Sequence, residues 1–200
     1  MNKQAAVAIG LAVMLVGGIA GYYVSQQTGQ QSLPQSSTAS PPGASNEVEF
    51  TLPDIDGVMR SSYDWSGKAR LINFWATWCA PCRREIPLLK KTQEEHAADN
   101  VQIIGIAVDF PEEVSAYAEE AQFNYPVLVG QEDAMAVAEV SGVEFIGMPF
   151  TMIVAPSGEL IKAHIGEIVE SHIERILSVF DDLESGRTDI AGARNALADL

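Results

Sequence analysis

The sequence predicts an α/β domain with a central mixed β-sheet flanked by helices, and three features support this. Apolar segments of strand length at 69–75, 101–109 and 126–130 alternate with segments of helical composition, as in parallel strands joined by helices. The segment 69–75, ARLINFW, is apolar on both faces, which is typical of a covered central strand. Finally, 151–155 and 159–165 flank a Pro-Ser-Gly turn and predict a closing hairpin.

Helices are expected between and after these strands. The helical segments are 81–98, 111–122, 132–142 and 169–183. Pro81 suits a first helical turn because the N–H it lacks would be unpaired there. Pro87 falls inside the first helix and should kink it. An extended stretch from Glu47, ending in an Asp-Gly turn, precedes the sheet.

Length and composition indicate one globular domain with attachments at its ends. The chain has 200 residues, of which 47% are apolar, enough for a hydrophobic core. We place the domain at 47–183 and a weakly structured tail at 184–200, where no strong apolar stripe is found. The net charge of -15, with 27 acidic and 12 basic residues, argues against nucleic acid as a partner, since phosphate binding needs clustered basic residues.

Residues 1–24 predict a transmembrane anchor. Residues 5–24 are uncharged and mostly apolar, and a helix of that length spans about 30 Å, the thickness of the hydrocarbon core. A cleaved signal peptide is the alternative, with Gly-Ile-Ala at 18–20 as its cleavage site. Tyr22 continues the apolar run with an aromatic residue typical of the membrane interface, which favours the anchor. The positive charge of Lys3 keeps the N-terminus in the cytoplasm, so the domain is expected outside.

Residues 25–46 predict a flexible linker. The segment is rich in Gln, Ser, Pro and Gly and nearly free of apolar side chains. It cannot bury enough surface to offset the entropy lost on ordering. The domain is therefore expected to be tethered near the membrane surface.

The two cysteines of the chain, Cys79 and Cys82, stand between the central strand and a helix. A structural disulfide is disfavoured because so small a loop removes little entropy from the unfolded chain. A zinc site is disfavoured because the other ligands would have to be His96, His164 and His172, which show no ligand spacing. A redox pair remains the favoured interpretation, and export to a compartment that permits disulfides supports it.

The position of the pair at the start of a helix predicts a role for each cysteine in disulfide exchange. At a helix N-terminus, unpaired N–H groups and the helix dipole stabilise the thiolate of Cys79, the nucleophile of disulfide exchange. Cys82 lies one turn later on the same helix face, where it can attack the mixed disulfide that Cys79 forms.

Four segments together resemble the thioredoxin superfamily, in particular its membrane-anchored, extracytoplasmic TlpA/ResA-like branch. They are FTLPDIDG, INFWATWCAPCRREIP, IIGIAVD and GMPFTMIVAPSGEL, and the resemblance covers about residues 47–180. It implies a thioredoxin-like fold and thiol-disulfide oxidoreductase activity. It also implies that Cys79 is the exposed attacking thiol, that Cys82 is the buried resolving thiol, and that the two form a redox-active disulfide.

The resemblance also assigns the surroundings of the pair. Pro149 would be a cis-proline facing the cysteines, and the backbone of Met148 would pair with the substrate chain. From the residues alone, the favoured interpretation of Pro149 is an ordinary trans-proline at a strand boundary. Trp78 would pack beside the active site, and Ala80 and Pro81, between the cysteines, would help to set the redox potential.

The sequence departs from the family at three positions. Asn73 occupies the position of a buried aspartate that serves thioredoxin as a base, and asparagine cannot take that role. Ala80 stands where some ResA-like proteins have glutamate between the cysteines. Phe150 follows the cis-proline where many relatives have a small polar residue, and we expect it to narrow the substrate groove.

Three carboxylates are candidate proton shuttles in place of the missing acid. They are Glu85, Asp109 and Glu144. For each of them a solvated or structural carboxylate is the competing interpretation.

The function implied by the resemblance is reduction of protein disulfides. The alternative substrates are apocytochrome c cysteines, as in cytochrome c maturation, copper-site cysteines of an oxidase assembly factor, and misbridged exported proteins. The implied partners are protein disulfide substrates and a transmembrane electron donor of the DsbD or CcdA type, with the protein held by its N-terminal helix in the bacterial inner membrane and its domain in the periplasm. No cofactor and no metal is expected. The alternative is a non-catalytic module that binds Cu(I) or a client protein with the same thiols. A peroxidase is disfavoured because its threonine-containing cysteine motif is absent from the sequence.

Overall fold

The computed structural model describes residues 47–140 and 142–200, which belong to one compact unit. The predicted anchor and linker, 1–24 and 25–46, lie outside the described residues. Within the described part of the chain, no helix is both long enough and apolar enough to cross a membrane.

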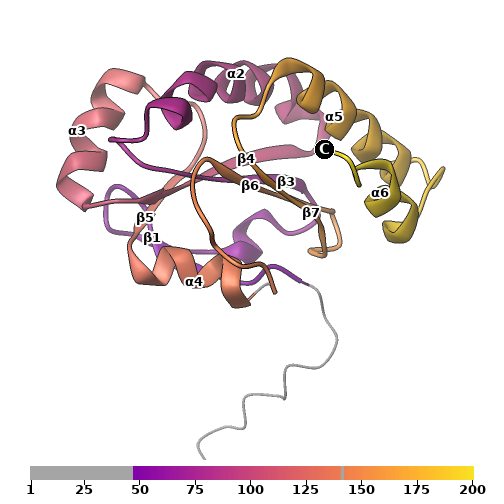
Figure 1. Cartoon of the computed structure of the whole chain (residues 1–200), viewed down its shortest axis with the longest axis horizontal. Coiled ribbons are helices and arrows are strands. Elements are labelled where there is room, and N and C mark those ends of the chain that lie inside the picture. The colour runs from indigo at the N-terminus through magenta and orange to yellow at the C-terminus, as the bar shows by residue number, and fades with distance from the viewer. Residues whose placement is uncertain (1–46, 141) are drawn as a thin grey trace, which may run out of the picture. The chain divides into compact units, whose positions relative to one another are not determined.

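A five-stranded mixed sheet forms the centre of the domain (Figure 1). Its strands are β3 (Ala69–Trp75), β4 (Val101–Val108), β5 (Val127–Gly130), β6 (Phe150–Val154) and β7 (Leu160–Ile165). The order across the sheet is β5-β4-β3-β6-β7. β3, β4 and β5 run parallel, whereas β6 and β7 are antiparallel to their neighbours. The predicted mixed sheet and its closing hairpin are thereby confirmed.

A smaller hairpin precedes the main sheet. It consists of β1 (Thr51–Pro53) and β2 (Met59–Ser61), followed by the short 3-10 helix η1 (Ser62–Trp65). The predicted Asp-Gly turn joins the strands: the Asp54 carboxylate accepts hydrogen bonds from two backbone N–H groups of the turn, and Gly57 has φ +78°, a conformation that glycine adopts readily.

Helices connect the strands as expected. They are α2 (Ala80–His96), followed by the short η2 (Ala97–Asp99), α3 (Pro111–Ala121), α4 (Glu132–Val140) and α5 (Glu170–Glu184). Each agrees with a predicted helix to within a few residues. α2 continues through Pro87 to His96.

The alternation of side chains along β3 divides the core into two layers. Leu71 and Trp75 join a cluster with α2, α3 and α5, whereas Ile72 and Phe74 join a second cluster with α4 and the β1–β2 hairpin. In Figure 1, α2 and α5 accordingly lie on one side of the sheet and α4 on the other. Asn73 has the same parity as Leu71 and Trp75, so its side chain faces α2.

The tail is ordered, contrary to the prediction of weak structure at 184–200. It forms the helix α6 (Ile190–Ala196), whose N-cap Asp189 accepts a hydrogen bond from Gly192 N at 2.8 Å. Ala193 and Leu197 are completely buried. Two inward positions one turn apart do not make a recognisable stripe in the sequence, yet they are enough to dock a two-turn helix.

We predict that Leu197→Ala lowers the free energy of unfolding by about 2–4 kcal/mol, because it removes a buried leucine and leaves a cavity. Asn195→Ala, at an exposed position of the same helix, should change it by less than about 0.5 kcal/mol. Urea denaturation of both variants provides the measurement. Equal, small effects would show that the tail does not pack as described.

Candidate active site

The site begins where β3 ends and α2 starts. Cys79 is the N-cap of α2 and is joined to Cys82 by a disulfide, with 5.3 Å between their Cα atoms. The Cys79 sulfur accepts a hydrogen bond from Cys82 N at 3.3 Å. The predicted position of Cys79 at a helix N-terminus is confirmed, and there the helix dipole would stabilise its thiolate after reduction.

Both cysteines are buried, Cys82 the more completely, so the exposed Cys79 that the resemblance implies is not found in the disulfide form. Cys79 is 5% exposed, whereas Cys82 is completely buried. Trp78, immediately before Cys79, is 69% exposed and presents a large apolar surface next to it. An incoming sulfur can therefore reach the pair only from the Cys79 side.

The Met148–Pro149 peptide bond is cis, as the resemblance implies. It leads into β6, the antiparallel neighbour of β3. Pro149 is buried and Met148 is half-buried.

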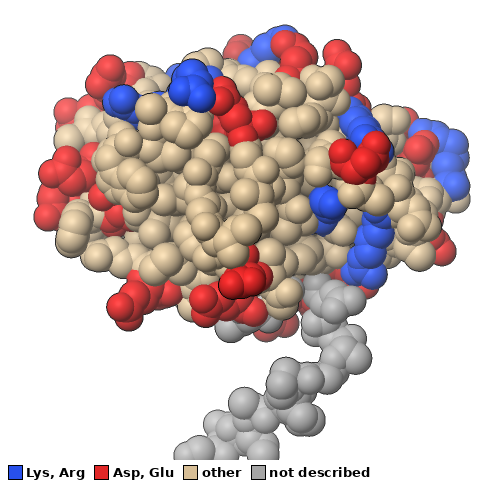
Figure 2. All heavy atoms as spheres, in the orientation of Figure 1, with Lys and Arg blue, Asp and Glu red and all other residues tan. Residues whose placement is uncertain are grey.

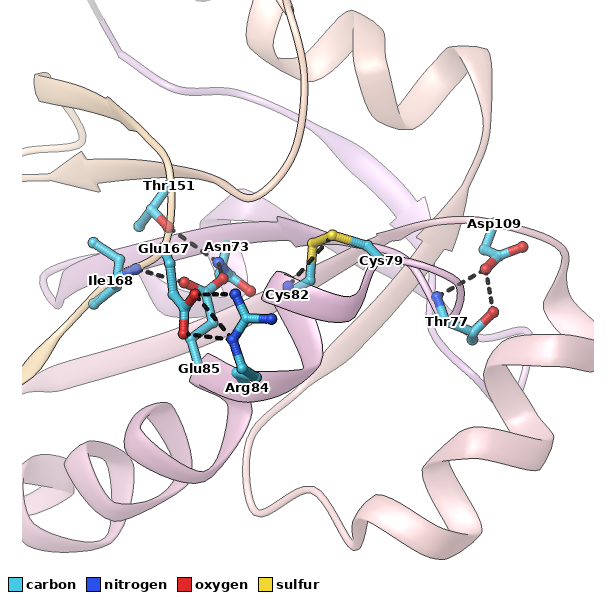
Figure 3. The surroundings of a disulfide bond; sticks show 10 residues. All are labelled: Asn73, Thr77, Cys79, Cys82, Arg84, Glu85, Asp109, Thr151, Glu167 and Ile168. Carbon is cyan, nitrogen blue, oxygen red and sulfur yellow. Dashed lines mark hydrogen bonds and ion pairs between the residues drawn. A yellow bond between two sulfur atoms is a disulfide. The ribbon is translucent and has the colours of Figure 1, made fainter.

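Glu85 is buried beneath the pair, only 1% exposed. It lies three residues after Cys82 on α2 and thus on the same helix face. Oε1 accepts a hydrogen bond from Asn73 Nδ2 at 2.7 Å, and Oε2 accepts one from Ile168 N at 2.6 Å. Asn73 Nδ2 also donates to Thr151 Oγ1 at 3.0 Å. These residues lie on the Cys82 side of the disulfide in Figure 3.

Burial raises the pKa of Glu85 from 4.5 to about 7. The apolar surroundings disfavour the ionised carboxylate. The hydrogen bonds from Ile168 N and Asn73 partly offset this effect, and the nearby charge of Glu167 adds to it. The carboxyl can therefore gain or lose a proton near neutral pH, which suits a general acid or base.

A more exposed ion pair lies next to the buried contacts of Glu85. Arg84 Nε donates to both carboxylate oxygens of Glu167, and Nη2 donates to Oε2 at 2.6 Å. Glu167 immediately precedes Ile168, whose N–H binds Glu85. Consecutive residues of α2 are thus bonded to consecutive residues of the segment between β7 and α5 (Figure 3).

Asp109 supports the other side of the disulfide. Its carboxylate Oδ2 accepts hydrogen bonds from Thr77 N at 2.9 Å and Thr77 Oγ1 at 2.6 Å, and Oδ1 accepts one from Phe110 N. Figure 3 shows the two bonds from Thr77 on the Cys79 side of the disulfide, away from Cys82. The structure thus shows Asp109 holding the loop before Cys79 through Thr77, and its role as a proton shuttle stays a prediction.

Glu144 is exposed in the segment that leads to Pro149. Among the described residues, the hydrogen bonds to Glu85 come from Asn73 and Ile168 and not from Glu144. Of the three carboxylates singled out by the sequence, the structure therefore brings only Glu85 to the buried side of the pair. The Asn73–Thr151 contact and the bond from Ile168 N were not predicted.

Phe150 does not narrow a substrate groove. It is completely buried, with its ring centroid 5.2 Å from that of Phe74 and 5.6 Å from that of Phe145. The alternation along β6 explains this correction, because Phe150 points to the face opposite Thr151. Trp75 is likewise a core residue, packed against Tyr117.

Other parts of the domain lie apart from the pair. Among the residues described, no group of three or more His, Cys, Asp or Glu is arranged to hold a metal. His164 packs against His172, with ring centroids 4.8 Å apart. A cavity of ≈ 1100 Å³ is lined by Ala69, Val101 and Phe180, at the end of β3 and β4 remote from the cysteines, so it is not the redox site.

Comparisons with known proteins agree with this geometry. A model of the AhpC/TSA family matches residues 45–163. The thioredoxin-like protein YneN of Bacillus subtilis is 31% identical over 121 residues, which cover 58% of this chain and 68% of YneN. The thiol-disulfide oxidoreductase ResA of Halalkalibacterium halodurans is 29% identical over 118 residues, which cover 58% of this chain and 65% of ResA, just under two thirds of its length.

A solved structure supports the fold assignment. The thiol:disulfide interchange protein of the thioredoxin family from Chlorobium tepidum superimposes with a TM-score of 0.59 at 29% identity, covering 66% of this chain and 92% of that protein. The chain therefore belongs to the AhpC/TSA family, has the thioredoxin-like fold, and is a relative of the ResA thiol-disulfide oxidoreductases.

Proposed function

We propose that this chain is a membrane-tethered thiol-disulfide oxidoreductase that reduces protein disulfides outside the cytoplasm. The observation that carries the proposal is the Cys79–Cys82 disulfide at the N-terminus of α2, in which Cys79 is 5% exposed and Cys82 is completely buried. The name of its ResA relatives supports the same chemistry.

In the proposed reaction, Cys79 attacks the substrate disulfide and Cys82 resolves the mixed disulfide. In the reduced protein the Cys79 thiolate attacks a substrate disulfide, forming a mixed disulfide and releasing one substrate thiolate. Cys82 then loses its proton and attacks the Cys79 sulfur, which releases the second substrate thiolate. Two electrons pass to the substrate, whose two sulfurs take up protons, and the 79–82 disulfide is left behind.

Glu85 is the proposed proton acceptor for Cys82. Cys82 is completely buried, so its proton needs a nearby group to receive it. Glu85 is on the same face of α2, one turn away, and its pKa is about 7. A base with this pKa works best near neutral pH.

The reduced state must be restored by another dithiol. A transmembrane donor of the DsbD or CcdA type would suit a domain held at the outer surface of the bacterial inner membrane. Apocytochrome c cysteines awaiting haem are a candidate substrate, because they must be kept reduced. The exposed Trp78 offers an apolar surface on which either partner can rest.

The reduction potential of the Cys79–Cys82 couple tests the proposed direction of electron flow. We expect a value near or below that of thioredoxin, ~-270 mV, in place of one near the ~-120 mV of the oxidant DsbA. The full-length protein is equilibrated in dithiothreitol redox buffers, and free thiols are counted after alkylation.

Cys82→Ser serves as the control for this measurement. It should show no intramolecular couple and should accumulate a stable mixed disulfide with substrate through Cys79. A wild-type potential near that of DsbA would reverse the proposed direction. Absence of any reversible two-electron couple would refute catalysis by dithiol exchange.

We predict that Glu85→Gln removes a pH dependence of stability from the oxidised protein. The native state keeps the Glu85 proton up to pH about 7, whereas the unfolded chain loses it near pH 4.5, so the native state binds more protons between these values. The free energy of unfolding of the wild type should therefore fall by roughly 3 kcal/mol as pH rises from 4.5 to 7. Urea denaturation at a series of pH values measures this slope.

Glu95→Gln, at an exposed position of the same helix, should retain the wild-type slope. Glu85→Gln should also slow disulfide reduction at pH 7 by at least about tenfold. If Glu85→Gln leaves the pH dependence of the free energy of unfolding as in the wild type, Glu85 ionises in the native protein as it does in water. An unchanged slope together with an unchanged rate would remove Glu85 from the mechanism.

The proposed membrane anchor rests on the apolar residues 5–24. We predict that the full-length protein stays with the membrane fraction after washing with alkaline carbonate, which removes peripheral proteins. A chain lacking residues 1–24 but exported by a cleavable signal should instead be released with the soluble periplasmic proteins. Recovery of the full-length chain in the soluble fraction, shortened near residue 20, would establish the signal peptide.

A further inference from the structure

Positive charge is concentrated on α2 in an otherwise acidic molecule. The chain has 12 Lys and Arg against 27 Asp and Glu. Four of the twelve lie on α2, the helix that begins at the disulfide: Arg83, Arg84, Lys90 and Lys91. In Figure 2, acidic side chains line the left and lower edges of the visible face, whereas basic side chains lie among acidic ones at its top, where Figure 1 places α2, and at its right.

Most exposed arginines already have carboxylate partners. Near the C-terminus, Arg175 pairs with Asp199, and Arg187 pairs with Asp181 and Asp182. These pairs neutralise the positive charge at that end of the domain.

The α2 cations are only partly neutralised. Arg84 pairs with Glu167, and Lys91 pairs with Glu170. Lys90 donates to a backbone carbonyl, that of Ala121. Arg83 is exposed and, within the described part of the chain, has no carboxylate at ion-pair distance.

Arg83 and Lys90 line a pocket of ≈ 350 Å³ between α2 and α3, and Lys91 and Glu94 complete its polar lining. Three cations and one carboxylate thus line the pocket, and of the cations Lys91 is already paired with Glu170. Arg83 directly follows Cys82, and Lys90 lies two turns further along, about 10 Å away along the helix axis.

The other walls are apolar. Pro87 on α2 and Tyr117 on α3 line the pocket. Tyr117 also stacks against the buried Trp75, with ring centroids 5.4 Å apart. A chain lying here would place apolar atoms on these walls and carboxylates beside Arg83 and Lys90.

We propose that this pocket binds an acidic segment adjoining the reactive cysteines of the protein dithiol that reduces the Cys79–Cys82 disulfide. This inference rests on the proposed function and adds the chemistry of its partner. Positive charge at a site surrounded by negative charge attracts an acidic segment there and repels it elsewhere on the surface.

The docked segment delivers its dithiol to the accessible end of the disulfide. One partner thiolate attacks Cys79 Sγ, the Cys79–Cys82 bond breaks, and Cys82 leaves with the electron pair and takes up a proton. The second partner thiolate then attacks the partner sulfur of the mixed disulfide, releasing Cys79. The partner ends as a disulfide, and two electrons have passed to this chain.

The test uses synthetic dithiol peptides with the same Cys-Ala-Ala-Cys core and a Gly-Gly spacer, followed by three Glu or three Gln residues. The rate of reduction of the oxidised full-length protein, in non-ionic detergent at low ionic strength, is followed by alkylation of the new thiols. The attacking group is the same in both peptides, so the ratio of their rates isolates the effect of the carboxylates. We expect the Glu peptide to react about three to ten times faster.

Two double variants test whether the difference in rate between the two peptides arises at the α2 pocket. Arg83→Gln with Lys90→Gln should bring the ratio close to one. Arg175→Gln with Arg187→Gln removes the same charge from the far end of the domain and should leave the ratio as in the wild type.

A ratio of one in the wild type, or an equal fall in both double variants, would overturn the docking proposal while leaving the oxidoreductase intact. If neither peptide reduces the disulfide, although dithiothreitol does, reduction by a protein dithiol is refuted and the docking proposal falls with it. The two failures are thereby distinguished.

Discussion

The site depends on a carboxylate in the protein interior and on the hydrogen bonds that satisfy it. Glu85 lies beneath a strand whose side chains are buried on both faces, where an unpartnered carboxylate would be strongly destabilising. Asn73 on β3 and the backbone N–H of Ile168 each donate to one of its oxygens. The same bonds join α2 to the central strand and to the segment before α5. Any movement of that segment would therefore change the surroundings of Cys82 as well.

This arrangement also explains how the site can lack the aspartate of thioredoxin. Asn73 cannot accept a proton, but its amide directs a hydrogen bond to a carboxylate supplied by the helix. The acid is thus moved from the strand to α2 and stays on the buried side of the disulfide. On the accessible side, Asp109 holds Thr77 in the loop before Cys79. The two sides of the disulfide thus have different carboxylates: Glu85, whose pKa is about 7, on the Cys82 side, and Asp109, bonded to Thr77, on the Cys79 side.

Sequence patterns predicted the architecture better than they predicted the polar contacts. The apolar segment 69–75 coincides with β3, and the helix start at Cys79 follows from the prolines and the strand end. The partners of Glu85 could not be found in this way, because Ile168 is 83 residues distant and donates through its backbone. The spacing of Glu85 from Cys82 was a usable signal, since i and i+3 share a helix face. The prediction that Phe150 narrows a substrate groove was wrong. The resemblance concerns the residues beside Phe150 along the chain, whereas its burial depends on the face of β6 to which its side chain points.

Charge balance links the buried carboxyl to electron transfer. When the disulfide is reduced, Cys82 becomes a leaving group with no access to solvent, beside a carboxyl that can itself be negative. Two neighbouring anions in an apolar interior would be costly, so the electrons must be accompanied by a proton on this side of the pair. With a pKa of about 7, Glu85 is close to half protonated at neutral pH and can give up that proton or take it back. Cys79 needs no such partner because the helix N-terminus stabilises its thiolate. In the reaction that we propose, electrons are therefore exchanged at Cys79, and the accompanying proton is exchanged on the more deeply buried side, at Cys82.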